Sequence, residues 1–288
     1  MNTVINKFVL LAGLPRTGST VLTNTLAQNN KFHIEGNSGL CQLMWDMQQS
    51  CNSHCAEQLK ANNKLDSVRE RVVGGLPALY YKGVSGKVIF DKCRPWVLPN
   101  NMEMAQRYIA EDIKAIVMIR PIDEIVRSFA KLHFEAGGDD SIYEKLMDDS
   151  SEVVMRSFKA THIAANSKAD NLLFISYENI IDDFIGVMNR IYDFIGEDKI
   201  IHNTSNIEQI LKEDASVYEI PKLHSIRSKV SKLKNDVVLP EWVEEKANFM
   251  TRTLYGALGI TNEQSYDGAA WVANPDSTDP KVAKLARL

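Results

Sequence analysis

The chain of 288 residues contains no long apolar run, and no segment approaches the 18 residues that a membrane-spanning helix requires. The first predicted strand begins within the first seven residues, which leaves no room before it for a secretory leader. We therefore expect a cytoplasmic protein that does not contact membranes. A basic excess is also missing, since 33 lysines and arginines face 37 aspartates and glutamates, for a net charge of −4. General nucleic-acid binding thus lacks its usual electrostatic basis, although a local basic site remains open.

Cysteine is scarce, with four residues in the chain, and their spacing shows no framework of the kind found in small secreted disulfide proteins. We therefore expect reduced thiols. Cys51, His54 and Cys55 could share a zinc ion with Cys41, but this spacing fits no structural zinc motif well. The sequence thus gives no reason to predict a metal site.

The stretch from Lys7 to Gln28 has the sequence order of a strand, a glycine loop and a helix. Phe8–Ala12 is an apolar run rich in β-formers, which is typical of a buried strand in a parallel sheet. Ser19 and Thr20 are residue types that cap helices, and apolar side chains recur at helical spacing after them. The segment therefore predicts a strand that leads through a tight loop into a helix.

The loop, Gly13–Gly18, has the spacing G-x-x-x-x-G-S-T of a phosphate-binding loop, with Ser19 where nucleotide triphosphatases carry lysine. The exposed amides and the positive dipole end of the following helix favour an anion. In a triphosphatase the lysine reaches the β and γ phosphates, so its absence argues against a triphosphate as the reacting group. Arg16 supplies a cation within the loop. The alternative is an ordinary strand-to-helix turn with a solvated arginine.

Further apolar segments alternate with helical patterns along the chain. Lys87–Asp91, Ile113–Ile119 and Asn171–Tyr177 are predicted strands, and Lys31–Gly39 is a short extended piece that runs into a turn. This alternation predicts an α/β fold, a P-loop-type open parallel sheet of about four to five strands with helices on both faces. We expect a single domain over residues 1–260 and a polar tail over 261–288. The predicted helices are two between Leu40 and Tyr81, punctuated at Asn62-Asn63 and closed near Gly74-Gly75 and Pro77, then Leu98–Glu111, Ile122–Phe134 and Ser151–Ser167.

Polar side chains follow the predicted strands at their carboxyl ends, where ligands bind in open α/β sheets. Glu35 follows the short extended piece and is equally well explained as a solvated loop carboxylate. Asp91 ends an apolar strand, which is also the pattern of a magnesium-binding segment in a kinase. We expect these side chains to share one crevice with the first loop. The set is Glu35, Asp91, Lys92, Arg120 and Tyr177.

Arg120 is followed after eight residues by Ser128, which falls on the next predicted helix. An arginine fork donates two hydrogen bonds to phosphate oxygens, so the pair is suited to clasp a phosphate. The alternative is a helix-start arginine near a solvated serine. The sequence therefore predicts two phosphate sites, the glycine loop and this pair, in one crevice.

Together the two segments carry a resemblance to a known family. PRTGST in the first loop and IRPIDEIVRS, which holds the arginine and its serine, resemble the sulfotransferases that use 3′-phosphoadenosine 5′-phosphosulfate (PAPS). The chain is especially similar to tyrosylprotein and Golgi-type members and their bacterial relatives, loosely over residues 8–260. The resemblance implies that Arg120 and Ser128 hold the 3′-phosphate. It implies that the 5′-phosphosulfate is held by Arg16, Thr17, Gly18, Ser19 and Thr20.

The same resemblance implies further roles. Glu35 falls where the tyrosylprotein members keep their catalytic base. Lys92 is similar to the lysine of their Asn-Lys-Asp-Pro segment, but one extra residue precedes Pro95, so either Lys92 or Arg94 could reach the sulfonate. The resemblance also implies nucleotide contacts from Tyr177, Ser228 and Lys229.

The implied reaction is an in-line displacement at sulfur by an acceptor hydroxyl, which could belong to a small molecule, a glycan or a tyrosine side chain. The by-product is 3′,5′-bisphosphoadenosine (PAP). Arg16, Lys92 and the loop amides would stabilise the charge on the leaving oxygen, and Glu35 would take the proton of the hydroxyl. The cations of the site are side chains, so no metal is expected, and a homodimer is a possible assembly.

Two other functions remain open. A magnesium-dependent P-loop kinase or triphosphatase is favoured by Asp91 and opposed by Ser19. A nucleotide-binding regulator without catalytic activity is favoured if Glu35 and Lys92 prove distant from the loop. His133, near a predicted helix end, is the histidine placed to rival Glu35 as the base.

Overall fold

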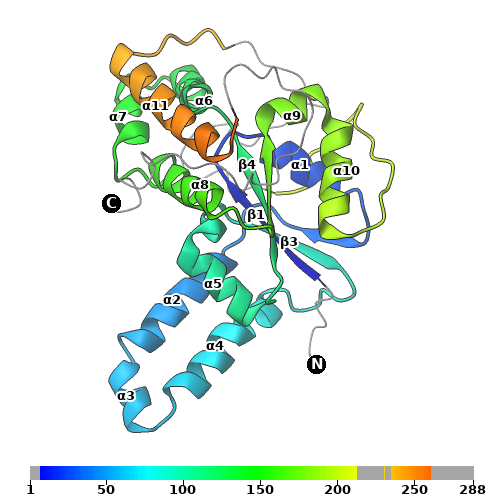
Figure 1. Ribbon diagram of the computed structural model, residues 1–288, viewed down its shortest axis with the longest axis vertical. Helices are drawn as coiled ribbons and strands as arrows, with labels where there is room; N and C mark the ends of the chain where they lie inside the picture. The colour runs from blue at the N-terminus through cyan, green and yellow to red at the C-terminus, as the bar shows by residue number, and fades with distance from the viewer. Residues whose placement is uncertain (1–6, 213–229, 231–234, 261–288) are drawn as a thin grey trace.

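A computed structural model describes residues 7–212, 230 and 235–260 of the chain. Within these residues the strands form one five-stranded sheet in the order β2-β3-β1-β4-β5, and every neighbouring pair is parallel (Figure 1). This confirms the predicted open parallel α/β sheet. The strands are β1 (Lys7–Gly13), β2 (Phe32–Ile34), β3 (Val88–Lys92), β4 (Lys114–Ile119) and β5 (Leu172–Ser176).

Both faces of the sheet are buried, which is why its strands are apolar almost without interruption. Alternate residues of β1 show the division: Phe8 and Leu10 belong to one hydrophobic cluster, and Val9 and Leu11 to the other. All four side chains are at most 4% exposed. Two separate layers of helices therefore cover the sheet, as the alternating pattern predicts.

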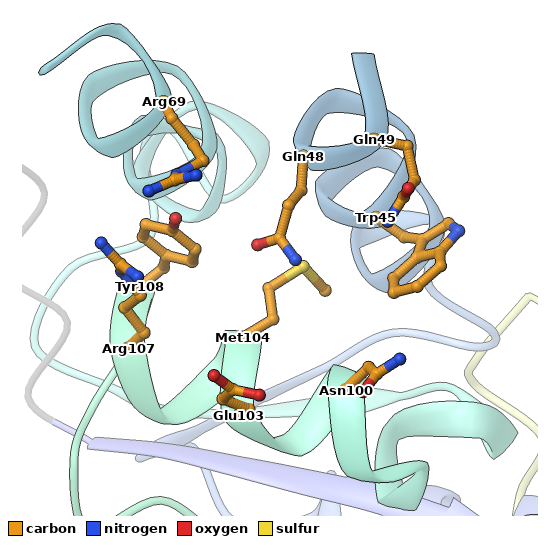
Figure 2. Close-up of a pocket in the computed structure, with 9 residues that line it drawn as sticks. All are labelled: Trp45, Gln48, Gln49, Arg69, Asn100, Glu103, Met104, Arg107 and Tyr108. Atoms are coloured by element: carbon orange, nitrogen blue, oxygen red, sulfur yellow. The ribbon is translucent and has the colours of Figure 1, made fainter. Parts of the chain in front are cut away.

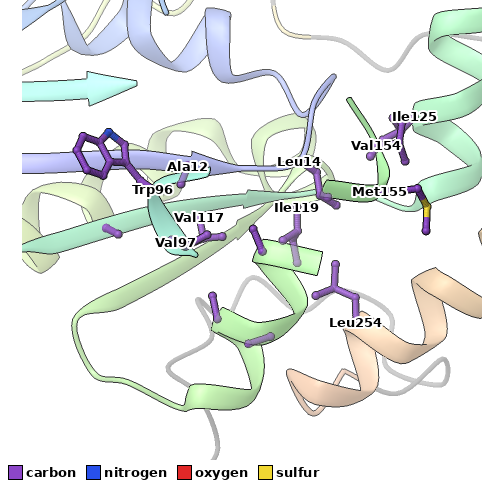
Figure 3. Close-up of a cluster of buried hydrophobic side chains, with 14 of the residues drawn as sticks. Ala12, Leu14, Trp96, Val97, Val117, Ile119, Ile125, Val154, Met155 and Leu254 are labelled. Carbon is purple, nitrogen blue, oxygen red and sulfur yellow. The ribbon is translucent and has the colours of Figure 1, made fainter. Parts of the chain in front are cut away.

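The larger cluster lies between the sheet and one layer of helices. Figure 3 shows part of it, with Trp96 and Val97 of the short helix η1 toward one side of the view, the sheet residues Val117 and Ile119 in the middle, and Leu254 of α11 toward the other side. Helix α6 joins this layer through buried positions 122, 125, 126, 129 and 130, the spacing of an amphipathic helix. The helices here are η1 (Arg94–Val97), α5 (Pro99–Tyr108), α6 (Ile122–Glu135), α7 (Ser141–Met147), α8 (Met155–Ser167) and α11 (Glu241–Ala257).

The opposite face is covered by α1 (Ser19–Leu26), α9 (Tyr177–Asp182) and α10 (Phe184–Ile195). Both ends of α10 are encoded locally. Asp183 accepts a hydrogen bond from the Gly186 amide at 2.8 Å, which caps the first turn. Gly196 ends the helix with a left-handed φ of 69°, a conformation that glycine adopts without strain.

Three helices project from the sheet as an arm, visible at the lower left of Figure 1: α2 (Leu40–Asn52), α3 (Ala56–Ala61) and α4 (Leu65–Tyr80). The prediction of two helices closed near Gly74-Gly75 and Pro77 is wrong, because α4 continues through all three residues. Val73 and Pro77 are buried one turn apart on the packed face of α4. Tertiary packing of this face outweighs the poor helix propensity of the sequence.

Other boundaries also differ from the predictions. Ser19 and Thr20 do not cap α1, since the N-cap position is Gly18 and no side chain caps it. The helix predicted over Ser151–Ser167 begins at Met155 instead, as α8, and is preceded by the unpredicted α7. Among the residues described, no helix is both long and apolar enough to cross a membrane.

Candidate active site

The strand register aligns the predicted site residues along the carboxyl edge of the sheet. Ile34 at the end of β2 pairs with Phe90 in β3, so Glu35 lies next to Asp91 and Lys92 at the end of β3. Leu11 pairs with Lys92. The loop that follows β1 therefore begins next to the end of β3, and on its other side are the ends of β4 and β5. In spatial order the edge presents Glu35, Lys92, the loop Gly13–Gly18, Arg120 and Tyr177.

The glycine loop has a fixed shape. A Cβ on Gly13, whose φ is 113°, would lie 2.2 Å from the carbonyl oxygen of Met118, so only glycine fits against β4. The Thr17 hydroxyl donates to the Leu14 carbonyl at 3.0 Å and closes the turn. Arg16 adopts a left-handed φ of 59°, which is rare for a side chain other than glycine. The loop is thus built for close backbone approach and reverses direction immediately before α1.

The structure joins the two predicted phosphate sites directly. The Arg16 Nε donates to the Ser128 hydroxyl at 3.1 Å, across 112 residues of sequence. Arg120 Nη1 donates to the backbone carbonyl of Arg16 at 2.7 Å, and its Nε donates to Glu124 at 3.0 Å. The Arg120 guanidinium lies 3.9 Å from the centre of the Tyr177 ring. Four residues predicted separately are therefore brought into one cluster at the carboxyl ends of β1, β4 and β5.

The electrostatics of this cluster favour an anion. Burial and, to a smaller extent, the nearby charge of Arg120 together lower the pKa of Arg16 to about 10, while Tyr177 opposes the shift. Two guanidinium groups held together in a partly dehydrated place are stabilised by negative charge between them. The N-terminal amides of α1 stand beside them and act in the same direction.

Asp91 is fully buried, and both of its oxygens accept hydrogen bonds from protein side chains. Ser38 and Tyr81 donate their hydroxyls to Oδ2, each at 2.6 Å, and Trp96 Nε1 donates to Oδ1 at 2.6 Å. Burial raises the pKa of the Asp91 carboxyl, and the three donors oppose that rise. The carboxylate is thus engaged within the protein, which weakens its interpretation as a magnesium-binding aspartate.

Lys92 and Glu35 occupy the other end of the edge. Lys92 is buried, and its carbonyl accepts a hydrogen bond from the Ser38 amide at 2.8 Å, which ties β3 to the loop after β2. Glu35 Oε1 lies 3.2 Å from His33 Nε2, and the Glu35 side chain is 43% exposed. The Glu35 carboxylate is therefore accessible from solvent. Its strand, β2, is separated only by β3 from β1, the strand that leads into the glycine loop.

Comparison with known proteins identifies the family of this chain. The model of a family described as the sulfotransferase family matches residues 9–200, more than half of the chain. The chain belongs to the sulfotransferase family. It is therefore an enzyme of sulfuryl transfer, and the resemblance carried by its two phosphate-site segments is confirmed at the level of the family.

Solved structures show that this sulfotransferase also has the fold of the family. The sulfotransferase domain of the olefin synthase from Synechococcus PCC 7002 matches 86% of the chain and 93% of its own length, with 16% identity and a TM-score of 0.57. The sulfotransferase domain from the curacin biosynthetic pathway matches 86% of the chain and 96% of its own length, with 14% identity and a TM-score of 0.53. No curated protein sequence matches the chain significantly.

His133, the alternative to Glu35 as the base, lies away from the carboxyl edge of the sheet. This histidine lies in the last turn of α6, roughly 16 Å along the helix from the end that follows β4. Its Nε2 accepts a hydrogen bond from the Asp139 amide at 3.2 Å, so the ring packs on the loop after α6. Two other predicted residues, Ser228 and Lys229, and the tail over 261–288 lie outside the described residues.

A polar pocket of about 170 Å³ lies among α2, α4 and α5, which carry none of the predicted site residues. Figure 2 shows its wall, which is formed by Trp45, Gln48, Gln49, Arg69, Asn100, Glu103, Met104, Arg107 and Tyr108. Its two arginines already form ion pairs, Arg69 with Asp66 at 2.6 Å and Arg107 with Glu70. Both arginines of this pocket are thus paired with carboxylates of α4.

Sequence reasoning missed the partners of Asp91 and of Glu35. Ser38, Tyr81 and Trp96 converge on one carboxylate from three different segments, and no local pattern links them. The alternation of β2 could have indicated His33, since His33 and Glu35 are two residues apart and share a side of the strand.

Proposed function

We propose that this sulfotransferase takes the sulfuryl group from PAPS and transfers it to the hydroxyl of an acceptor. The proposal rests above all on the contact between Arg16 and Ser128 with Arg120 behind it. Those three residues come from the two segments that resemble the PAPS sites of the family. A donor with phosphate groups at both its 5′ and 3′ positions fits a cationic cluster that spans two such segments.

The donor would bind along the β1, β4 and β5 part of the sheet edge. The amides from Thr17 to Thr20, at the start of α1, would hold the 5′-phosphosulfate. Arg120 and Ser128 would hold the 3′-phosphate, with Arg120 kept in place by the ring of Tyr177 and by Glu124. Arg16 lies between the two and would contact either phosphate, since its Nε reaches Ser128 while its backbone belongs to the loop.

In the proposed reaction, one group of residues stabilises the leaving group and another residue removes the proton of the acceptor. As the acceptor hydroxyl attacks sulfur, the S–O bond to the 5′-phosphate breaks, and negative charge grows on the departing phosphate oxygen. Arg16, Lys92 and the loop amides are the donors that would stabilise this charge. The hydroxyl proton would pass to the Glu35 carboxylate, whose exposure leaves it accessible to an acceptor. These side chains account for the charge changes of the reaction.

A kinase or triphosphatase is the weaker alternative. Such an enzyme would need a lysine at position 19 and an aspartate free to hold magnesium through water. Here position 19 is serine, and both oxygens of Asp91 accept hydrogen bonds from protein donors. An inactive nucleotide-binding regulator would share the donor site but would not need Glu35 or Lys92.

Titration calorimetry with PAP, and separately with ATP and magnesium, tests the donor. We expect PAP to bind more tightly, since it carries a phosphate for each of the two segments. Tighter binding of ATP and magnesium would reject the proposal in favour of the kinase. Sulfation of a panel of hydroxyl acceptors with PAPS then separates an active transferase from a regulator that binds PAP without turnover.

A further inference from the structure

The loop that carries Glu35 is tied to the end of β3 at two points, both through Ser38. The Ser38 amide donates to the Lys92 carbonyl at 2.8 Å, and the Ser38 hydroxyl donates to Asp91 Oδ2 at 2.6 Å. The same hydroxyl accepts a hydrogen bond from the Leu40 amide at 3.0 Å, at the first turn of α2. Only Gly36 and Asn37 separate Glu35 from this double attachment, so little chain is left to move independently.

We propose that Ser38, anchored on the buried Asp91, is the positioning residue that holds Glu35 beside Lys92 for proton removal from the acceptor. This inference rests on the proposed function, because it gives Ser38 a role only if Glu35 is the base. Neither Ser38 nor Asp91 is assigned a contact with donor or acceptor. Their effect on turnover passes through the position of the loop.

The geometry separates this role from simple stabilisation. Asp91 receives three hydrogen bonds of equal length, but only the one from Ser38 comes from the Glu35 loop. Tyr81 follows α4, and Trp96 lies in η1. A base must be held within about 0.5 Å of its productive position, and a misplacement of 1 Å can cost about 10²-fold in rate. Loss of the Ser38 attachment should therefore affect turnover, whereas loss of the other two attachments should affect stability.

Two hydroxyl deletions make a matched pair. Ser38→Ala and Tyr81→Phe each remove one hydrogen bond of 2.6 Å to the same oxygen, Asp91 Oδ2. Ser38→Ala also removes the acceptor of the Leu40 amide, which is part of the attachment under test. We expect Ser38→Ala to lower kcat by about tenfold, with PAP affinity within about twofold of wild type. Tyr81→Phe should lower the melting temperature about as much as Ser38→Ala does, while its kcat falls by about twofold or less. Equal losses of kcat in the two variants would overturn the proposal, because they would reveal a common effect of weakening Asp91.

A double-mutant cycle with Glu35→Gln shows whether Ser38 acts through Glu35. If it does, adding Ser38→Ala to Glu35→Gln should cost less than about twofold in kcat, since the base is already lost. An additive loss of about tenfold would overturn the positioning role and leave the base assignment standing. Wild-type turnover of Glu35→Gln would instead reject the base, and the positioning role with it. Should Ser38→Ala fail to fold, Ser38→Cys keeps the size and only a weak donor, and the same criteria apply.

Discussion

The Arg120 guanidinium donates to the backbone carbonyl of Arg16 at 2.7 Å, so the residue at the end of β4 supports the glycine loop that follows β1. Arg16 has a left-handed backbone, and this hydrogen bond is one of the contacts that hold it there. The two proposed phosphate sites share this contact, so we expect a change at either arginine to affect both of them. This shared contact shapes the first two predictions.

Arg120→Ala should weaken PAP binding by about 1.5 to 3 kcal/mol, because it removes one charged hydrogen-bond donor to the 3′-phosphate. The loss for 5′-AMP, which has no 3′-phosphate, should be clearly smaller and should reflect only the weakened support of the loop. Titration calorimetry with both ligands measures the difference. Equal losses for PAP and 5′-AMP would reject the 3′-phosphate assignment.

Arg16→Ala should lower kcat by about 10²-fold and donor affinity by less, because the charge on the leaving oxygen grows only as the S–O bond breaks. Ser128→Ala is the matched variant, since it removes the hydroxyl that Arg16 Nε contacts while leaving the guanidinium in the site. It should weaken PAP binding and change kcat little. Steady-state kinetics with a working acceptor gives both constants, and unchanged turnover in Arg16→Ala would contradict the role.

Glu35→Gln keeps the size of the side chain and removes its basicity, so turnover should fall by about 10²-fold or more. PAP binding should stay within about threefold of wild type, since the carboxylate lies two strands away from β1. Glu57→Gln, on the exposed part of α3, serves as the control and should behave as wild type. A parallel loss of binding and turnover in Glu35→Gln would indicate a structural role instead.

Gly13→Ala should destabilise the protein by more than about 3 kcal/mol, because its Cβ would meet the Met118 carbonyl at 2.2 Å and its φ of 113° is strained for alanine. Gly256→Ala, in helix α11 with open space around the new methyl group, should instead be neutral or stabilise by up to about 1 kcal/mol. Urea unfolding of the two variants tests both statements. A stable Gly13→Ala protein would show that the loop can adopt another shape.

The fold was predictable because its signals are local. The apolar runs of the long strands and the glycine spacing after Phe8–Ala12 fall within single short segments. The order of the strands in the sheet was not part of the prediction. The arm was misread for the opposite reason. Gly74, Gly75 and Pro77 have weak helix propensity, and only burial of one face of α4 keeps them helical.

The residues of the candidate site could be proposed from the sequence, but the contacts among them could not. Arg16 and Ser128 were each identified, yet their hydrogen bond joins residues 112 apart and depends on β1 and β4 being neighbours. The role of Asp91 was ambiguous for the same reason. A strand that ends in aspartate suits a magnesium site or a buried anchor, and only the side chains that surround it, Ser38 among them, decide between the two.

The strand order also sets a length scale for what the enzyme can hold. Glu35 and Tyr177 follow β2 and β5, which are separated by four strand spacings, roughly 19 Å. A donor held between β1 and β5 would use about half of that span, two of the four strand spacings, which leaves the β2 side to the acceptor. In the described sheet no strand lies beyond β2, on the side left to the acceptor. We expect its non-reacting part to extend past the rim of the sheet, so that a bulky acceptor is accommodated as readily as a small one.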